Sequence, residues 1–89
     1  MAILTLGTAR MGMLQYASPV STTDVRLGLH DVGACQLVFD VDDVQAEYKR
    51  LLEMGVKFKS EPTTDAQARI IAAQAFDPDG VTVEIVERI

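Results

Sequence analysis

The stretch "LVFDVDDVQAEYKRLLEMGVKFKSEP", residues 37–62, decides the fold expected for this chain, because it joins a strand, a helix and a second strand in direct succession. Residues 34–41, "ACQLVFDV", form the expected first strand. Successive side chains of a strand point to opposite faces, so one face is apolar and the other mixed. The apolar face comprises Leu37, Phe39 and Val41, and the mixed face comprises Gln36, Val38 and Asp40.

The segment that follows has the pattern of an amphipathic helix. Asp42 is the expected N-cap, with Gln45 at the capping-box position three residues later. Gly55 is expected to end the helix as a left-handed residue. We therefore expect a helix over residues 44–54 that covers the apolar face of the sheet. Its own apolar face carries Val44, Tyr48, Leu51 and Leu52 at helical spacing.

Three more strands are expected after the helix. Residues 56–62 alternate in polarity, residues 63–67 read as a loop, and residues 68–76 form a strand that ends at "DPDG", a type I turn. The last strand, "VTVEIVERI", carries Glu84 between Val83 and Ile85, so strand alternation directs Glu84 to the face without the helix. The expected fold class is α+β, a βαβββ module with a mixed sheet and one helix on one face.

The N-terminal part has a different character. Residues 1–17 contain two apolar runs joined by a short Gly-containing connection, which predicts a β-hairpin. Residues 18–33 read as a linker, so the chain is expected to be one domain over residues 1–89 with the module at 34–89. The hairpin is apolar on both faces, and such a hairpin needs cover from elsewhere. This feature predicts a homodimer.

Composition narrows the classes of partner. The chain has 89 residues and a formal net charge of −5 without any run of Lys or Arg, which argues against nucleic acid and anionic membranes as partners. No apolar stretch reaches the length of a membrane span, and residues 1–14 lack the basic leader of a signal peptide. The single cysteine, Cys35, is expected to be a buried small residue, and it fits a cytoplasmic location.

Two stretches carry a resemblance to a known family: residues 37–62, quoted above, and "AFDPDGVTVEIVE", residues 75–87. They resemble the vicinal oxygen chelate superfamily, which contains the glyoxalase, bleomycin-resistance and extradiol-dioxygenase proteins. "GMLQYASP", residues 12–19, is similar to the close of a preceding unit in such proteins. The resemblance implies one complete module plus the tail hairpin of another, with no counterpart here of that other unit's first strand and helix.

The resemblance also implies a cofactor, although the residues themselves establish none. Members of the family hold a divalent metal ion with two side chains from each module, and those positions correspond to Gln36 and Glu84 in this chain. The corresponding position of the preceding unit is Gly12, which has no ligand atom. A hard divalent ion needs several oxygen or imidazole ligands, so Gln36 and Glu84 alone make an incomplete set.

Three functions are compatible with these observations. The first, which we favour, is a small-molecule-binding protein that takes an apolar or amphipathic ligand in a cleft of the sheet completed by dimerisation. The second is a metal-dependent lyase, isomerase or dioxygenase with Glu84 as the catalytic residue. The third is an assembly role without catalysis. In the favoured reading the ligand contacts are Gln36, Glu84 and Tyr16 as polar groups, with Val38, Met13 and Val86 as apolar walls.

Overall fold

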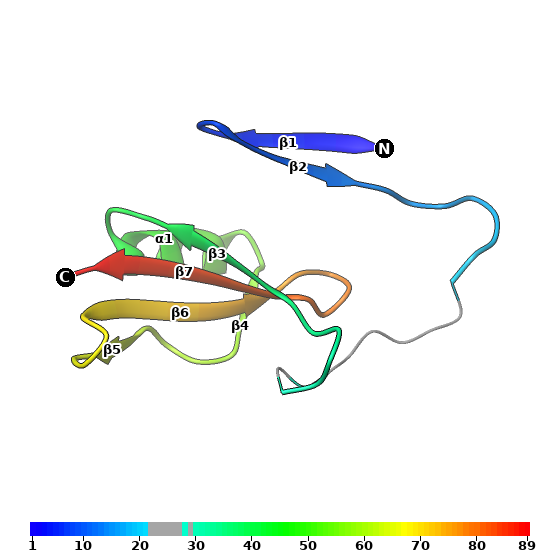
Figure 1. Cartoon of the computed structure of the whole chain (residues 1–89). Coiled ribbons are helices and arrows are strands. Elements are labelled where there is room, and N and C mark those ends of the chain that lie inside the picture. The colour runs from blue at the N-terminus through cyan, green and yellow to red at the C-terminus, as the bar shows by residue number, and fades with distance from the viewer. Residues whose placement is uncertain (22–27, 29) are drawn as a thin grey trace.

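The computed structural model describes residues 1–21, 28 and 30–89. In that part of the chain it contains a two-stranded sheet, a five-stranded sheet and one helix (Figure 1). The small sheet consists of β1 (Ala2–Leu6) and β2 (Ala9–Met13). The helix is α1 (Val44–Glu53). The large sheet consists of β3 (Gln36–Asp40), β4 (Lys57–Phe58), β5 (Thr63–Asp65), β6 (Ile70–Phe76) and β7 (Thr82–Arg88).

The large sheet is mixed, as the sequence predicts. Its strand order is β3-β7-β6-β4, with β5 also paired to β6. The β3–β7 pair is parallel, and the other pairs are antiparallel. The single helix follows β3 and packs against β6 and β7. The α+β class and the βαβββ order are therefore confirmed.

The helix begins at Val44 as expected, but its N-cap lies one residue later than the expected one. Its N-cap is Asp43, whose side chain accepts a hydrogen bond from the Ala46 amide at 3.1 Å, and not Asp42. The β3–β7 ladder explains the shift, because the Val41 amide still donates to the Val86 carbonyl at 2.8 Å. A distant carboxylate adds a second cap, since the Val44 amide donates to Glu87 Oε1 at 2.9 Å. With Asp43 as the N-cap, the residue at the capping-box position is Ala46 and not the expected Gln45.

The helix ends through the glycine that the sequence predicts. Gly55 has φ +89°, and its amide donates to the Leu52 carbonyl at 3.0 Å. The Val56 amide donates to the Leu51 carbonyl at 3.0 Å, which completes a Schellman motif. Met54 is the C-cap, so the helix is one residue shorter than expected.

The core lies between α1 and one face of the sheet. Val44 is fully buried and packs with Ala73 of β6 and Ile85 of β7. Tyr48 and Phe58 meet edge to face, with ring centroids 4.7 Å apart. Half-buried hydrophobic residues surround this cluster: Phe39, Val41, Tyr48, Leu51, Phe58 and Ile71.

Several local expectations were wrong. The sequence predicts that Leu37 and Leu52 lie in the helix–sheet contact, but 37% and 44% of their surfaces are exposed and neither packs in the core cluster. Cys35 is exposed because β3 begins only at the next residue. The stretch 63–67 was read as a loop, yet Thr63–Asp65 pairs with β6, where β-branched threonines suit an edge strand.

The N-terminal hairpin forms a sheet of its own. Leu6 pairs with Ala9 across a connection in which Gly7 takes φ +59°, and the register runs back to Ala2 opposite Met13. Figure 1 shows this hairpin beside β3 and separate from the large sheet. The linker predicted for residues 18–33 lies in part outside the described residues. No helix in the described part of the chain is long and apolar enough to cross a membrane.

Candidate functional site

The face of the sheet opposite α1 carries the predicted site residues in register. Val38 pairs with Glu84 in the β3–β7 ladder, and Glu84 pairs with Gln74 in the β6–β7 hairpin. Paired residues point to the same face of a sheet, and residues two apart on one strand share that face. Ile85 and Ala73, one residue away from these positions, pack under the helix. Gln36, Val38, Glu84 and Val86 therefore share the face without the helix.

One amide side chain connects the two predicted polar residues. Gln74 Nε2 donates to Gln36 Oε1 at 3.3 Å and to Glu84 Oε2 at 3.2 Å, in a half-buried position. The sequence prediction missed Gln74. Its signal was available in the hairpin register, because the "DPDG" turn places Phe76 opposite Thr82 and hence Gln74 opposite Glu84. The turn itself has the expected Gly80-to-Asp77 hydrogen bond of 3.0 Å.

An open groove of about 670 Å³ runs along this face from Glu84 towards the far end of β7. Its middle is apolar, with Val38 half exposed at 54% and Val86 only 6% exposed beneath it. Ile70 continues the apolar strip on β6, where it pairs with Arg88. The same groove therefore has a carboxylate at one end and hydrophobic walls beyond it.

Charged side chains line the other end of the groove. Arg88 Nε lies 3.4 Å from Asp40 Oδ1, and both side chains are mostly exposed. Arg69, in the β5–β6 connection, also lines the groove, and it has φ +59°, a left-handed conformation uncommon for a residue other than glycine. Its carbonyl accepts the Ile89 amide at 3.0 Å, which holds this connection against the end of β7.

The donor set of one chain does not fit a divalent metal ion. Gln36 and Glu84 offer oxygen atoms that already accept hydrogen bonds from Gln74. Within residues 1–21, 28 and 30–89, no group of three or more His, Cys, Asp or Glu side chains could hold a metal. His30 is exposed and lies 3.7 Å from Asp31, outside the groove. Divalent ions such as Ca²⁺ and Mg²⁺ take about six ligands, so two oxygens from one chain are too few.

Two predicted ligand contacts lie away from this groove on their own chain. Met13 ends β2 opposite Ala2 and is 49% exposed. Tyr16 is 68% exposed and lines a separate hollow with Pro19 and Val20. The structure therefore brings together Gln36, Val38, Glu84 and Val86, but it does not bring Met13 or Tyr16 to them.

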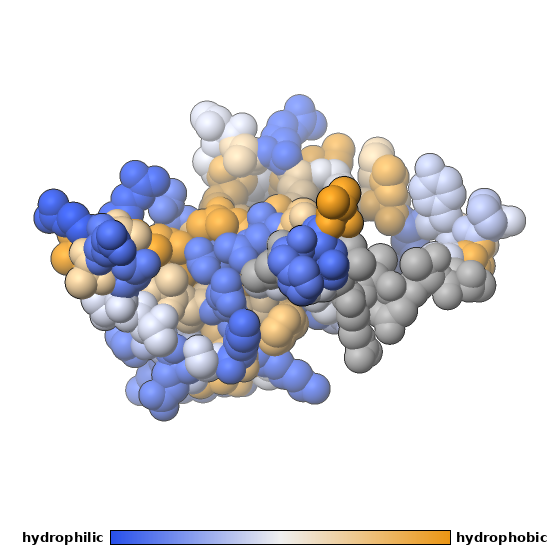
Figure 2. All heavy atoms as spheres, turned by 60° about the horizontal axis from the view of Figure 1, so that its bottom comes forward, coloured by the Kyte–Doolittle hydropathy of each residue, from blue (hydrophilic) through white to orange (hydrophobic). Residues whose placement is uncertain are grey.

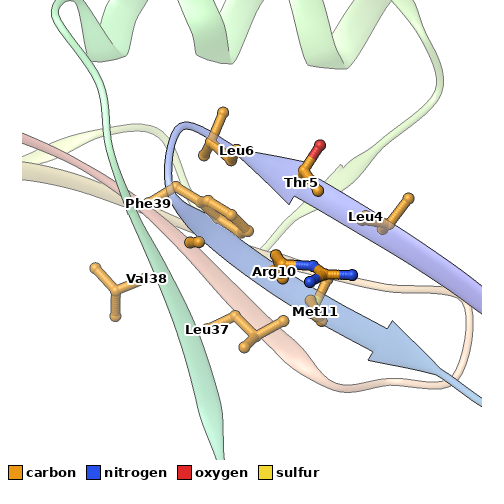
Figure 3. Close-up of a pocket in the computed structure, with 9 residues that line it drawn as sticks. Leu4, Thr5, Leu6, Arg10, Met11, Leu37, Val38 and Phe39 are labelled. Atoms are coloured by element: carbon orange, nitrogen blue, oxygen red, sulfur yellow. The ribbon is translucent and has the colours of Figure 1, made fainter.

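A second hollow of about 470 Å³ separates the hairpin from β3. Figure 3 shows its walls, with Phe39 and Leu37 of β3 facing Leu6 and Met11 of the hairpin. Neither bordering strand has a second neighbour in the described sheets, because β2 pairs only with β1 and β3 pairs only with β7. This slot therefore presents two strand edges and an apolar lining.

Comparisons with known proteins were made for the sequence and for the fold. The family model described as Glyoxalase/Bleomycin resistance protein/Dioxygenase superfamily matches residues 2–85. No curated protein matched the chain. A solved member of the glyoxalase/bleomycin resistance protein/dioxygenase superfamily from Sphaerobacter thermophilus is 28% identical, with a TM-score of 0.55, over 62% of this chain and 45% of its own.

Two other solved structures show the same fold at lower identity. A glyoxalase family protein from Bacillus cereus has a TM-score of 0.67 at 18% identity, over 82% of this chain and 49% of its own. An integron cassette protein from V. cholerae has a TM-score of 0.63 at 24% identity, over 96% of this chain and 66% of its own. The chain thus spans about half the length of most of the solved structures that it matches.

Proposed function

This chain belongs to the glyoxalase/bleomycin resistance protein/dioxygenase superfamily, and from that premise we propose that it binds a small apolar or amphipathic molecule on the sheet face opposite α1. The observation that supports the proposal is the groove along β7. It combines an apolar floor with four charged side chains, which are Asp40, Arg69, Glu84 and Arg88, and this mixture suits an amphipathic molecule.

Each groove residue has a distinct role in this proposal. Val38 and Val86 supply the apolar wall and floor. Glu84 supplies a hydrogen-bond acceptor, and Gln36 lies beside it. Gln74 holds both oxygens in place, so the polar end is already organised before a ligand arrives, which reduces the entropy lost on binding.

The binding proposal is tested with N-phenyl-naphthylamine, a neutral apolar probe whose fluorescence rises on leaving water. We expect saturable binding to the native protein. Val38→Asp, which places a charge on the groove wall, should raise the dissociation constant at least about tenfold. Val32→Asp is the matched control, because Val32 is fully exposed and lies outside the groove.

Equal binding by both variants would contradict the proposed site. A signal that rises without saturation would contradict specific binding altogether. Both variants are first compared with the native chain by circular dichroism, so that a loss of fold is not read as a loss of binding.

We also propose that a second copy of the chain completes the cleft through the slot between β2 and β3. Backbone groups along an unpaired strand edge are satisfied by another strand, and a two-fold pairing supplies one to each copy at once. The slot walls are already exposed for such a contact, with Leu4 at 49% and Leu6 at 62%. Figure 2 views the molecule from the side away from the hairpin, and on that face hydrophobic surface lies between hydrophilic side chains.

Light scattering coupled to size-exclusion chromatography tests this assembly. We expect twice the 9.7 kDa chain mass at micromolar concentration. Leu6→Glu, in the slot, should yield the monomer mass, whereas Leu52→Glu, on the exposed margin of α1, should keep the dimer. A monomeric native chain would refute the assembly, and it would leave Met13 and Tyr16 without a route to the groove.

A further inference from the structure

The groove opposite α1 is polar at both ends and apolar between them. The row formed by Val38, Glu84 and Gln74 marks one end, and the pair formed by Arg88 and Ile70 marks the other. Between them Val86 pairs with Ala72 of β6 on one side and with Asp40 of β3 on the other, and the Asp40 carboxylate lies beside Arg88. A ligand that filled the groove would therefore meet a polar group, then a hydrophobic strip, then a second polar group.

The first end carries a carboxylate, Glu84, with which no described cationic side chain forms an ion pair. Glu84 accepts its hydrogen bond from the neutral amide of Gln74. Among the described residues, the ion pairs join Arg50 to Glu47, Arg88 to Asp40 and His30 to Asp31, so none includes Glu84. Its environment suits a ligand group that donates hydrogen bonds and carries positive charge.

The opposite end carries the complementary charge. Arg88 is already paired with Asp40, so that pair adds little net charge. Arg69 lines the same end, and in the described part of the chain no carboxylate lies within ion-pair distance of it. A guanidinium presents a planar fork of donors that matches a carboxylate.

The distance between the ends sets the length of the ligand. Glu84 and Arg88 are four residues apart on β7, and a strand rises about 3.3 Å per residue, so their backbones are separated by about 13 Å. Arg69 directly precedes Ile70, which pairs with Arg88, so it lies one residue beyond that level, opposite Ile89. Both side chains are long enough to shorten the gap between the charged groups.

We propose, building on the small-molecule function above, that this groove selects an amphipathic molecule with an amine near Glu84, an apolar body over Val86 and a carboxylate near Arg69. Three matched probes test this class: ω-aminooctanoate, octanoate and octylamine. The first has both charged ends on a chain that approaches the span of the groove. Octanoate lacks the amine, and octylamine lacks the carboxylate.

Calorimetric titration of the native protein should give ω-aminooctanoate a dissociation constant at least about tenfold lower than that of either other probe. Arg69→Gln should remove its advantage over octylamine. Glu84→Gln should remove its advantage over octanoate. Lys49→Gln and Glu53→Gln, both at exposed positions of α1, remove one charge of each sign outside the groove and outside the slot, and they should leave both preferences intact.

The outcomes separate this inference from the function on which it rests. Equal affinity for all three probes, or preferences that Arg69→Gln and Glu84→Gln leave unchanged, would overturn the inference while the groove remains a binding site. Binding of N-phenyl-naphthylamine without binding of any of the three would overturn it in the same way. Failure of all four probes would overturn the proposed function as well.

Discussion

Gln74 donates one amide group to two acceptors on neighbouring strands, and the polar end of the groove depends on it. Gln74→Leu would leave Gln36 Oε1 and Glu84 Oε2 without their donor in a half-buried site. Hydrogen bonds to charged groups are stronger than neutral ones, so the free energy of unfolding should fall by about 1–2 kcal/mol in a urea titration.

The double variant Gln74→Leu/Glu84→Leu gives this prediction its control. Replacing both partners by apolar side chains removes the stranded acceptor, so much of the loss should be recovered. If the double variant loses as much free energy of unfolding as Gln74→Leu and Glu84→Leu lose together, the two side chains do not interact. That result would contradict the arrangement described above.

Val44 is the one fully buried large side chain among the described residues. Full burial of a valine side chain contributes about 1.5–3 kcal/mol, and Val44→Ala should lose a large part of that in the free energy of unfolding. Val32→Ala, at a fully exposed position, should change it by less than about 0.5 kcal/mol. Similar losses for the two variants would place the core elsewhere.

The sequence predicted which residues share the groove face, because strand alternation assigns a face to each residue without knowledge of the partner strands. It therefore placed Gln36 and Glu84 together. It did not reveal Gln74, Arg69 or the Arg88–Asp40 contact, since these depend on which strands are neighbours and on the connection between β5 and β6. The predicted ligand contacts Met13 and Tyr16 come from the N-terminal segment expected to form the hairpin, and their role remains a prediction.

The start of α1 offers a sharp test between two adjacent aspartates. Asp43 caps the helix through the Ala46 amide, whereas no hydrogen bond to the side chain of Asp42 is described. Removal of an N-cap side chain costs about 1 kcal/mol. Asp43→Ala should therefore lower the free energy of unfolding by about that amount, and Asp42→Ala should change it little. A larger loss for Asp42→Ala than for Asp43→Ala would instead support Asp42, the N-cap expected from the sequence.

The end of α1 allows a second comparison, between two glycines. An added Cβ would touch nothing within 4 Å at Gly55 or at Gly12, so crowding does not distinguish them. Backbone conformation does, because Gly55 has φ +89° and Gly12 does not have a positive φ. Gly55→Ala should cost about 1 kcal/mol in thermal or urea unfolding, while Gly12→Ala should be neutral or slightly stabilising. Equal losses of stability in Gly55→Ala and Gly12→Ala would show that the positive φ of Gly55 is not the cause of the loss.

The predicted elements were most accurate where local chemistry controls them. The helix cap at Gly55 and the turn at Asp77–Gly80 depend on residues that are close in the sequence. The sequence alone therefore predicts both. The N-cap was misplaced because the β3–β7 ladder extends to Val41, a long-range effect. The short β5 strand was missed for the same reason, since Thr63–Asp65 forms a strand only by pairing with β6.

The molecule as a whole is more extended than its length requires. Its radius of gyration is 14.8 Å, whereas a compact domain of this size has about 12 Å. The hairpin beside the slot accounts for the difference, since it forms its own sheet away from the large one (Figure 1). The sequence predicted the hairpin and its apolar faces, but its position relative to β3 is a tertiary property without a local signal.

The parallel pairing of β3 with β7 has a consequence for synthesis on the ribosome. The strand between β3 and β6 in the sheet is the last of the five to be translated, and it also supplies Glu87 to the start of α1. Until β7 leaves the exit tunnel, β3 has no partner strand in the large sheet, and α1 can pack only against the part of the sheet formed by β4, β5 and β6. The module therefore completes its sheet late, and β3 stays without a partner strand until β7 has been translated.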